Sequence, residues 1–153
     1  MPDVPAVHDR FTLIRNYPHA PAKVFAAFAT EEGKRRWFAA PDGEWDLVER
    51  SFDFRVGGIE TIEANWKTGK NSRMDAVYHD IVADRRIVYS YRMALSGVPI
   101  SVSMTSIELT PDDAGTRLTL TEHGIYLDGY EDKGSREHGV GWQMDKLGET
   151  LPD

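Results

Sequence analysis

The chain contains no cysteine among its 153 residues. It therefore has no disulfide bond, no thiol nucleophile and no thiolate metal ligand. It also lacks an apolar run close to the roughly 18 residues that a transmembrane helix needs, and its N-terminus lacks the basic and then apolar pattern of a signal peptide. We therefore expect a cytoplasmic protein without membrane insertion.

Positive charge is scarce as well. Lysine and arginine together number 18 against 25 aspartates and glutamates, which gives a formal net charge of −7. This charge argues against binding to nucleic acid or to an anionic lipid surface. With 41% apolar and 28% charged residues, the composition is that of an ordinary globular protein, and the length fits a single domain.

The common catalytic and metal-binding motifs are missing too. The histidines show none of the H-E-x-x-H or H-x-H spacings of metal ligands; they are His8, His19, His79, His123 and His138. The chain has neither the G-x-S-x-G motif of a serine hydrolase nor the G-x-x-x-x-G-K-S/T motif of a phosphate-binding loop. We therefore predict no metal and no cofactor.

The clearest pattern that is present lies in residues 51–66, which we predict to form two strands joined at Gly57-Gly58. Apolar and polar side chains alternate on both sides of the glycines, as in a strand with one buried face. The apolar members are Phe52, Phe54, Val56, Ile62, Ala64 and Trp66. Two glycines supply the positive φ angles that a tight hairpin requires.

Alternation and turn signals divide the rest of the chain into further elements. Residues 1–9 are expected to be a loose tail, and residues 39–50 a loop with some extended structure. Strands are predicted at residues 10–17, 73–82, 86–93, 100–110 and 116–126. Short helices are predicted at residues 21–29 and 31–38. A long helix is predicted to begin within residues 131–139 and to end near Leu151, because apolar residues recur there at helical spacing: Val140, Met144, Leu147 and Leu151.

The sequence also predicts how the second helix begins and ends and how the long helix packs. Thr30 is a candidate N-cap for the second helix, and the basic residues Lys34, Arg35 and Arg36 complement the dipole at its C-terminal end. We interpret these bases as a solvated helix end, with a phosphate or carboxylate site as the alternative. The glycines of the long helix, Gly139, Gly141 and Gly148, are expected to allow close packing.

This order of elements predicts an α+β fold in which a curved antiparallel sheet surrounds the C-terminal helix. One helix cannot fill a wide concave surface, so we expect an internal cavity between the two unless bulky side chains fill it.

Several segments resemble one known family. Residues 21–25 resemble its P-x-x-V-F/W helix start, which Trp37 follows, and residues 53–58 resemble its D-x-R-V-G-G hairpin. Residues 87–89 resemble the strand after a turn whose usual proline is replaced by Ala83-Asp84. Residues 115–122 resemble a G-T-x-L-T-L-T-E strand, and Gly141-Trp142 with Leu147 resembles the family's last helix. This is the heat-shock-protein-90 ATPase activator-homologue family, within the START-like (SRPBCC) helix-grip superfamily that includes the major birch pollen allergen.

The resemblance covers nearly the whole chain and implies the order β-α-α-β6-α. Most members of the superfamily carry a hydrophobic cavity that binds lipids, steroids, polyketides or similar molecules, and some are cyclases or hydrolases. We therefore expect a small hydrophobic or aromatic ligand. Its predicted contacts are Trp37, Phe54, Tyr89, Tyr91, Met93, Glu122, Tyr126, Trp142 and Met144.

Glu122 is the only candidate catalytic residue. It shares strand parity with Leu118 and Leu120, so it is expected to point inward, where burial would raise the pKa of its carboxyl group. The alternative is an acid at a strand end, either in water or paired with Arg55 or Arg117. Two other functions therefore stay open beside ligand binding: an enzyme that uses a carboxylate in the cavity, and a protein-interaction module like the co-chaperone domain. The sequence leaves the ligand and the oligomeric state undetermined.

Overall fold

The computed structural model describes residues 5–39, 43–130 and 132–153. Its elements follow in the order β1 (Val7–Tyr17), α1 (Pro21–Ala29), α2 (Glu31–Trp37), β2 (Trp45–Phe52), β3 (Ile59–Trp66), β4 (Asn71–Val82), β5 (Arg86–Leu95), β6 (Val98–Asp112), β7 (Gly115–Tyr126) and α3 (Ser135–Thr150). This is the predicted α+β fold of order β-α-α-β6-α, and the fold class is confirmed.

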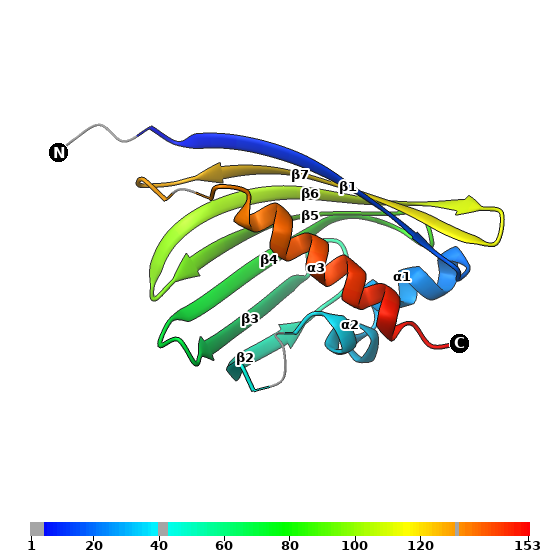
Figure 1. Cartoon of the computed structure of the whole chain (residues 1–153), viewed down its shortest axis with the longest axis horizontal. Helices are drawn as coiled ribbons and strands as arrows, with labels where there is room; N and C mark the ends of the chain where they lie inside the picture. Colours follow the sequence, from blue (N-terminus) through cyan, green and yellow to red (C-terminus); the bar gives the residue numbers. More distant parts are fainter. Residues whose placement is uncertain (1–4, 40–42, 131) are drawn as a thin grey trace.

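The strands form one seven-stranded antiparallel sheet in the order β1-β7-β6-β5-β4-β3-β2. Strands β2 to β7 follow one another as hairpins, and β1 pairs with β7 at the far edge. The sheet curves around α3, while α1 and α2 lie near the C-terminal end of that helix (Figure 1). Within the described residues, every helix is too short or too polar to cross a membrane.

Two strands at the edges of the sheet extend beyond their predicted bounds. Strand β1 begins at Val7, so the last three residues of the predicted tail are extended; residues 1–4 lie outside the described part. Strand β2 begins at Trp45, within the segment predicted to be mainly a loop, of which residues 40–42 are not described. Its pairing with β3 shifts between Leu47 and Glu49, and this irregularity interrupts the alternation that identifies a strand.

The turn at Gly57-Gly58 is wider than the predicted hairpin. Strand β2 ends at Phe52, so Phe54 and Val56 lie in the turn and not in a strand. Gly57 has a positive φ of 83°, but Gly58 does not. Gly58 is needed for a different reason, because a Cβ there would collide with the carbonyl oxygen of Asp53. The prediction that both glycines supply positive φ is therefore wrong for Gly58.

The helix signals in the sequence are confirmed in part. Helix α1 begins at Pro21, and the Thr30 hydroxyl accepts a hydrogen bond of 3.0 Å from the amide of Gly33, as an N-cap does. Helix α3 buries Met144 and Leu147, and Leu151 just after it is buried too. Residue 131, the first of the range predicted for its start, is not described.

The glycines of α3 differ in their surroundings. A Cβ on Gly148 would lie 2.8 Å from the ring of Tyr17, and one on Gly141 would lie 3.2 Å from the guanidinium of Arg15. Close packing is therefore confirmed for these two. A Cβ on Gly139 would meet no atom within 4 Å, so the expectation is wrong for this residue.

Candidate ligand-binding cavity

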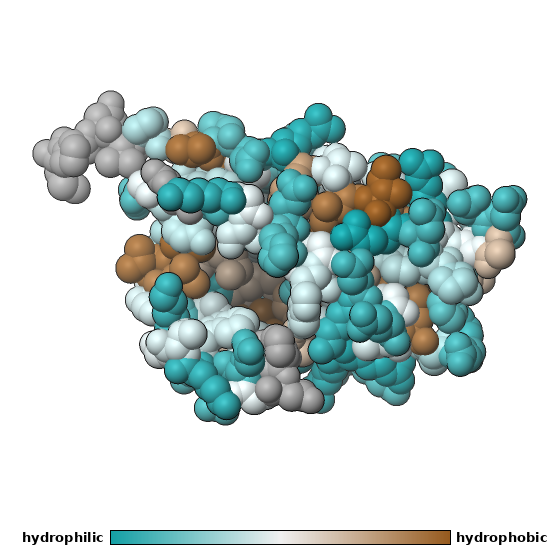
Figure 2. Space-filling model, viewed as in Figure 1, coloured by the Kyte–Doolittle hydropathy of each residue, from teal (hydrophilic) through white to brown (hydrophobic). Residues whose placement is uncertain are grey.

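A cavity of about 430 Å³ lies between the concave face of the sheet and α3. The face of the molecule shown in Figure 2 is hollowed beside α3, and apolar side chains are visible inside the hollow. The hollow lies where the sequence predicts space between one helix and a curved sheet.

Small residues flank Tyr91 on the inward face of the sheet. Tyr91 on β5 is in register with Ala76 on β4 and with Ser103 on β6, and Ser103 is in register with Gly124 on β7. These neighbours share the inward face of the pleated sheet and have little side-chain volume. The space above Gly124 is taken by the ring of Tyr126 and that above Ser103 by the guanidinium of Arg136, so of these four residues Tyr91 lines the cavity.

All four tryptophans of the chain line the cavity. Trp45 and Trp66 are paired across β2 and β3, with ring centroids 5.4 Å apart. Trp37 is buried and donates a hydrogen bond of 2.9 Å to the carbonyl oxygen of Ala27. Trp142 on α3 is 39% exposed. Aromatic side chains thus form a large part of the cavity wall.

Most of the contact residues predicted from the sequence line the cavity. They are Trp37, Tyr89, Tyr91, Met93, Glu122, Trp142 and Met144. Alternation along β5 and β7 and the helical stripe of α3 placed Tyr89, Tyr91, Met93, Glu122 and Met144, whereas Trp37 and Trp142 belong to the segments that resemble the family. Sequence reasoning missed other lining residues, among them Lys34, Trp45, Glu60, Trp66, Arg136 and Gln143.

Phe54 and Tyr126 do not line the cavity, which corrects their prediction. Phe54 lies in the turn after β2, where its ring packs 4.9 Å from that of Tyr78 and 5.8 Å from that of Phe25. Tyr126 faces inward, as its parity predicts, but stacks on Tyr130 at 6.1 Å. Tyr130 lines the cavity in its place.

Glu122 is buried at one end of the cavity, with 1% of its surface exposed. The Tyr91 hydroxyl donates a hydrogen bond of 2.8 Å to its Oε2, and the Thr105 hydroxyl donates one of 2.9 Å to its Oε1. Burial raises the pKa of the Glu122 carboxyl group, although these donors and Arg136 oppose the shift. The alternative of a solvated acid paired with Arg55 or Arg117 is therefore wrong.

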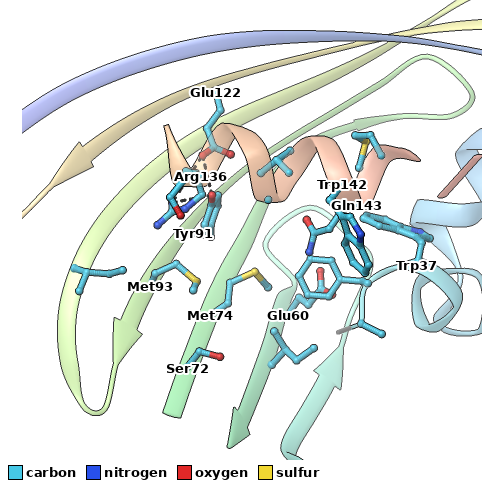
Figure 3. Close-up of a pocket in the computed structure, with 18 of the residues that line it drawn as sticks. Trp37, Glu60, Ser72, Met74, Tyr91, Met93, Glu122, Arg136, Trp142 and Gln143 are labelled. Carbon is cyan, nitrogen blue, oxygen red and sulfur yellow. Dashed lines mark hydrogen bonds and ion pairs between the residues drawn. The ribbon is translucent and has the colours of Figure 1, made fainter. Parts of the chain in front are cut away.

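Arg136 is the cation of this first polar cluster, which we define as Tyr91, Glu122 and Arg136 (Figure 3). Its Nη1 lies 3.8 Å from Oε2 of Glu122 and donates a hydrogen bond of 3.0 Å to the Tyr91 hydroxyl. Its Nη2 donates one of 2.8 Å to the hydroxyl of Ser101. No pattern in the sequence pointed to Arg136, because the start of α3 could be placed only within nine residues.

A second polar cluster, Lys34, Glu60 and Tyr78, lies at another part of the cavity wall. The Lys34 ammonium is 3.1 Å from Oε1 of Glu60, and their side chains are 8% and 4% exposed. The Tyr78 hydroxyl donates a hydrogen bond of 2.6 Å to the same oxygen. The Lys34 ammonium also lies 5.0 Å from the ring centre of Trp37 and 4.8 Å from that of Phe38.

The prediction of a solvated basic helix end is therefore correct for Arg35 and Arg36 but wrong for Lys34. Arg35 and Arg36 pair at the surface with acids one turn earlier in α2. Lys34 is three residues before Trp37, so both side chains lie on the face of α2 that packs inward. The position of Lys34 three residues before Trp37 is the sequence signal from which its burial could have been predicted.

Tyr89 connects the two clusters across the floor of the cavity. Its ring centroid is 6.0 Å from that of Tyr78 and 6.1 Å from that of Tyr91. Burial raises the pKa of Tyr89, and the carboxylates of Glu122 and Glu60 raise it further, so its hydroxyl stays protonated at neutral pH. The floor thus presents a neutral hydroxyl between two buried ion pairs.

Known proteins of similar sequence and structure agree with this architecture. A family model described as "Activator of Hsp90 ATPase homolog 1-like protein" matches residues 18–152. A search of curated proteins finds no match. An AHSA1-like protein of Aeromonas hydrophila, whose solution structure is known, is 16% identical, covers 92% of this chain and 90% of its own, and has a TM-score of 0.67. At that identity it shows the fold alone.

Two solved structures are much more similar. A crystal structure of a Rhizobium loti protein has a TM-score of 0.88 and 44% identity over 95% of this chain and 99% of its own. A Rhizobium leguminosarum protein described as uncharacterized has a TM-score of 0.91 and 37% identity over 96% of each chain. Since the family model spans nearly the whole sequence, the chain belongs to the family of activator of Hsp90 ATPase homolog 1-like proteins.

Proposed function

We propose that the protein binds a small, mostly apolar or aromatic molecule in the cavity between the sheet and α3. The observation that supports this most directly is an unfilled space of about 430 Å³ bounded by all four tryptophans of the chain. Its volume falls within the range of about 300–1,000 Å³ that ligand pockets occupy. Its walls are mostly apolar with a few placed polar groups, which is also typical of such pockets.

Intrinsic tryptophan fluorescence gives a direct test, because every tryptophan faces the cavity. Titration with a panel of fatty acids, sterols and polycyclic aromatic molecules should reveal at least one selective, saturable change in emission. The same ligand at 100 times its Kd adds about 2.7 kcal/mol to the free energy of unfolding, which should raise the Tm by about 5 °C or more.

A narrowed cavity supplies the matched control. Gly139 lines the cavity, and a Cβ there meets no atom within 4 Å, so Gly139→Leu should reduce the space while retaining the fold. The expected result is weaker binding by this variant. Equal binding by both proteins would place the ligand elsewhere and contradict the proposal. If no molecule of the panel changes the tryptophan emission and the protein forms a saturable complex with Hsp90, a protein-interaction module would be favoured instead.

A second candidate function is an enzyme that uses Glu122 as an acid or base. Its burial and raised pKa favour this role, since a carboxyl group whose pKa is raised keeps its proton more readily and can act as an acid. Each of its oxygens already accepts one hydrogen bond, from Tyr91 and from Thr105, and a substrate would have to share these oxygens or displace a donor. The enzyme hypothesis requires that a bound ligand be converted, and that Glu122→Gln abolish this conversion while binding persists.

A further inference from the structure

We propose that Lys34, Glu60 and Gln143 form a subsite for a neutral hydroxyl group, so that the ligand is an aromatic alcohol or phenol. The inference rests on the proposed function, because it names the ligand class of the same cavity. All three residues line that cavity.

Glu60 has hydrogen-bonding capacity that its neighbours do not use. Its Oε1 accepts from the Tyr78 hydroxyl at 2.6 Å and lies 3.1 Å from the Lys34 ammonium. Its Oε2 accepts no hydrogen bond from the residues that the structure describes. A carboxylate oxygen at the wall of a cavity can accept hydrogen bonds, so Oε2 is a position where a donor on a ligand would be stabilised.

Lys34 has unused donors at the same place. An ammonium group carries several N–H donors and no acceptor. In the described part of the chain, its contacts are the Glu60 carboxylate and the faces of the Trp37 and Phe38 rings. An acceptor atom on a ligand that lies against these rings would therefore find an N–H donor beside it.

Gln143 adds an uncharged donor and acceptor. Figure 3 shows its amide directed from α3 into the cavity, on the side of Trp37 and Glu60 and away from Glu122 and Arg136. No side-chain hydrogen bond joins this amide to any described residue. Gln143 follows Arg136 by two helical turns, about 10 Å along α3, which separates it from the first polar cluster.

A hydroxyl group matches this arrangement better than a charged group does. It can accept from Lys34 and donate to Oε2 of Glu60 at the same time, and it adds no charge to the ion pair. A carboxylate would compete with Glu60 for Lys34, and an ammonium group would compete with Lys34 and Arg50 for Glu60, whereas a hydroxyl leaves these charge interactions in place. The subsite therefore selects for a neutral hydroxyl.

The first polar cluster has less free capacity. Both oxygens of Glu122 accept hydrogen bonds, and Arg136 already donates to Tyr91, Ser101 and Ser103. Keeping a second buried ion pair at the cavity wall is not explained by stability, since desolvation offsets much of the attraction between its charges. A role in recognition accounts for the Lys34–Glu60 pair.

The test compares three probes with one ring system: 2-naphthol, naphthalene and 2-naphthoate. Affinities are measured by tryptophan fluorescence and calorimetry at neutral pH. We expect 2-naphthol to bind at least about 10-fold more tightly than either of the others, because hydrogen bonds to charged groups are stronger than neutral ones. The preference for 2-naphthol over naphthalene should disappear in Lys34→Met/Glu60→Gln, a variant that removes both charges together and leaves none unpaired.

Arg35→Met provides the matched control, because it removes a cation from the same helix at a side chain that is 59% exposed and paired at the surface. Arg35→Met should bind 2-naphthol more tightly than naphthalene, as the wild type does. Equal binding of 2-naphthol and naphthalene to the wild type would overturn the hydroxyl subsite and leave the aromatic cavity standing. The same preference in the double variant would overturn it too. Failure of all three probes to bind folded protein would overturn both proposals for aromatic ligands.

Discussion

The hydroxyl of Tyr91 donates a 2.8 Å hydrogen bond to Oε2 of Glu122, and this contact joins β5 to β7 across the intervening strand β6. Thr105 on β6 donates to the other carboxylate oxygen, so three adjacent strands are joined at one buried acid. Glu122 is therefore both a structural junction of the sheet and the most strongly buried acid of the cavity wall.

This burial predicts a specific pH dependence of stability. The pKa of Glu122 is raised in the folded protein above its ordinary value of 4.5, so the folded state binds the proton more tightly than the unfolded chain does. The resulting stabilisation is fully present below pH 4.5 and is lost as pH rises through the folded pKa. Above pH 4.5, wild type should therefore lose stability relative to Glu122→Gln, as measured by urea unfolding at a series of pH values.

The pH dependence of this difference in stability separates the effect of the carboxyl group from that of its hydrogen bonds. Glutamine presents an NH₂ group to either Tyr91 or Thr105, which gives an offset that does not vary with pH. Only the slope of the difference between the two proteins reports on titration. Parallel stability curves from pH 4 to pH 7 would show that Glu122 has an ordinary pKa and would also weaken the enzyme hypothesis.

The Lys34–Glu60 ion pair predicts a non-additive pair of substitutions. Lys34→Met alone leaves the Glu60 carboxylate buried without its cation, which should lower the free energy of unfolding by about 3–5 kcal/mol. Lys34→Met/Glu60→Gln removes both charges and should lose clearly less. Chemical unfolding followed by circular dichroism gives both values. A double variant as unstable as the single variant would show that the pair is stabilising in itself.

Arg35→Met again serves as the reference for this experiment. Its ion pair with Glu31 is more than half exposed on both sides, and exposed pairs contribute about 0–1 kcal/mol. Comparing the loss of stability in Lys34→Met with that in Arg35→Met therefore shows the effect of burial, since both substitutions remove one positive charge from α2.

Much of the fold followed from local patterns in the sequence. Alternation along β5 and β7 and the apolar stripe of Met144, Leu147 and Leu151 fixed which faces are buried, because these elements lie against one core. Strand β2 was missed because it is an edge strand with mostly exposed side chains and a shift in register. Its alternation is therefore not enforced by burial.

The cavity could be predicted as a location but not in its polar chemistry. Glu122 was placed by parity, whereas its partner Arg136 is close only because α3 crosses the sheet at a particular position. Glu60 and Lys34 are 26 positions apart in the chain and meet through tertiary packing alone. Single-sequence patterns contain no information on such contacts.

The glycines of α3 predict opposite effects for the same substitution. Gly148→Ala places a Cβ 2.8 Å from the buried ring of Tyr17, whose hydroxyl is fixed by a 2.8 Å hydrogen bond to the carbonyl oxygen of Met144. It should destabilise the protein by about 1–3 kcal/mol. Gly139→Ala meets no atom and should stabilise it by up to about 1 kcal/mol through helix propensity. Thermal unfolding of both variants checks the pair, and equal effects would contradict the packing at Gly148.

Substitution of two tryptophans of the cavity wall should have different effects, one mainly on ligand affinity and the other mainly on stability. Trp142 is 39% exposed, so Trp142→Ala should leave the fold intact yet remove aromatic surface from the cavity. We expect an aromatic ligand to bind about 10-fold more weakly, because an aromatic contact contributes about 0.5–1.5 kcal/mol beyond its buried area. Trp37 is 3% exposed and hydrogen-bonded to Ala27, so Trp37→Ala should cost about 3–5 kcal/mol of stability.

The two variants together identify where the ligand lies. Calorimetric affinity is compared with the free energy of unfolding for each protein at one temperature. Binding to Trp142→Ala at wild-type affinity would place the ligand away from α3 and contradict the proposed site. A large loss of stability in that variant would mean that Trp142 belongs to the core, and the aromatic wall would then be a packing feature of the fold with no ligand required to explain it.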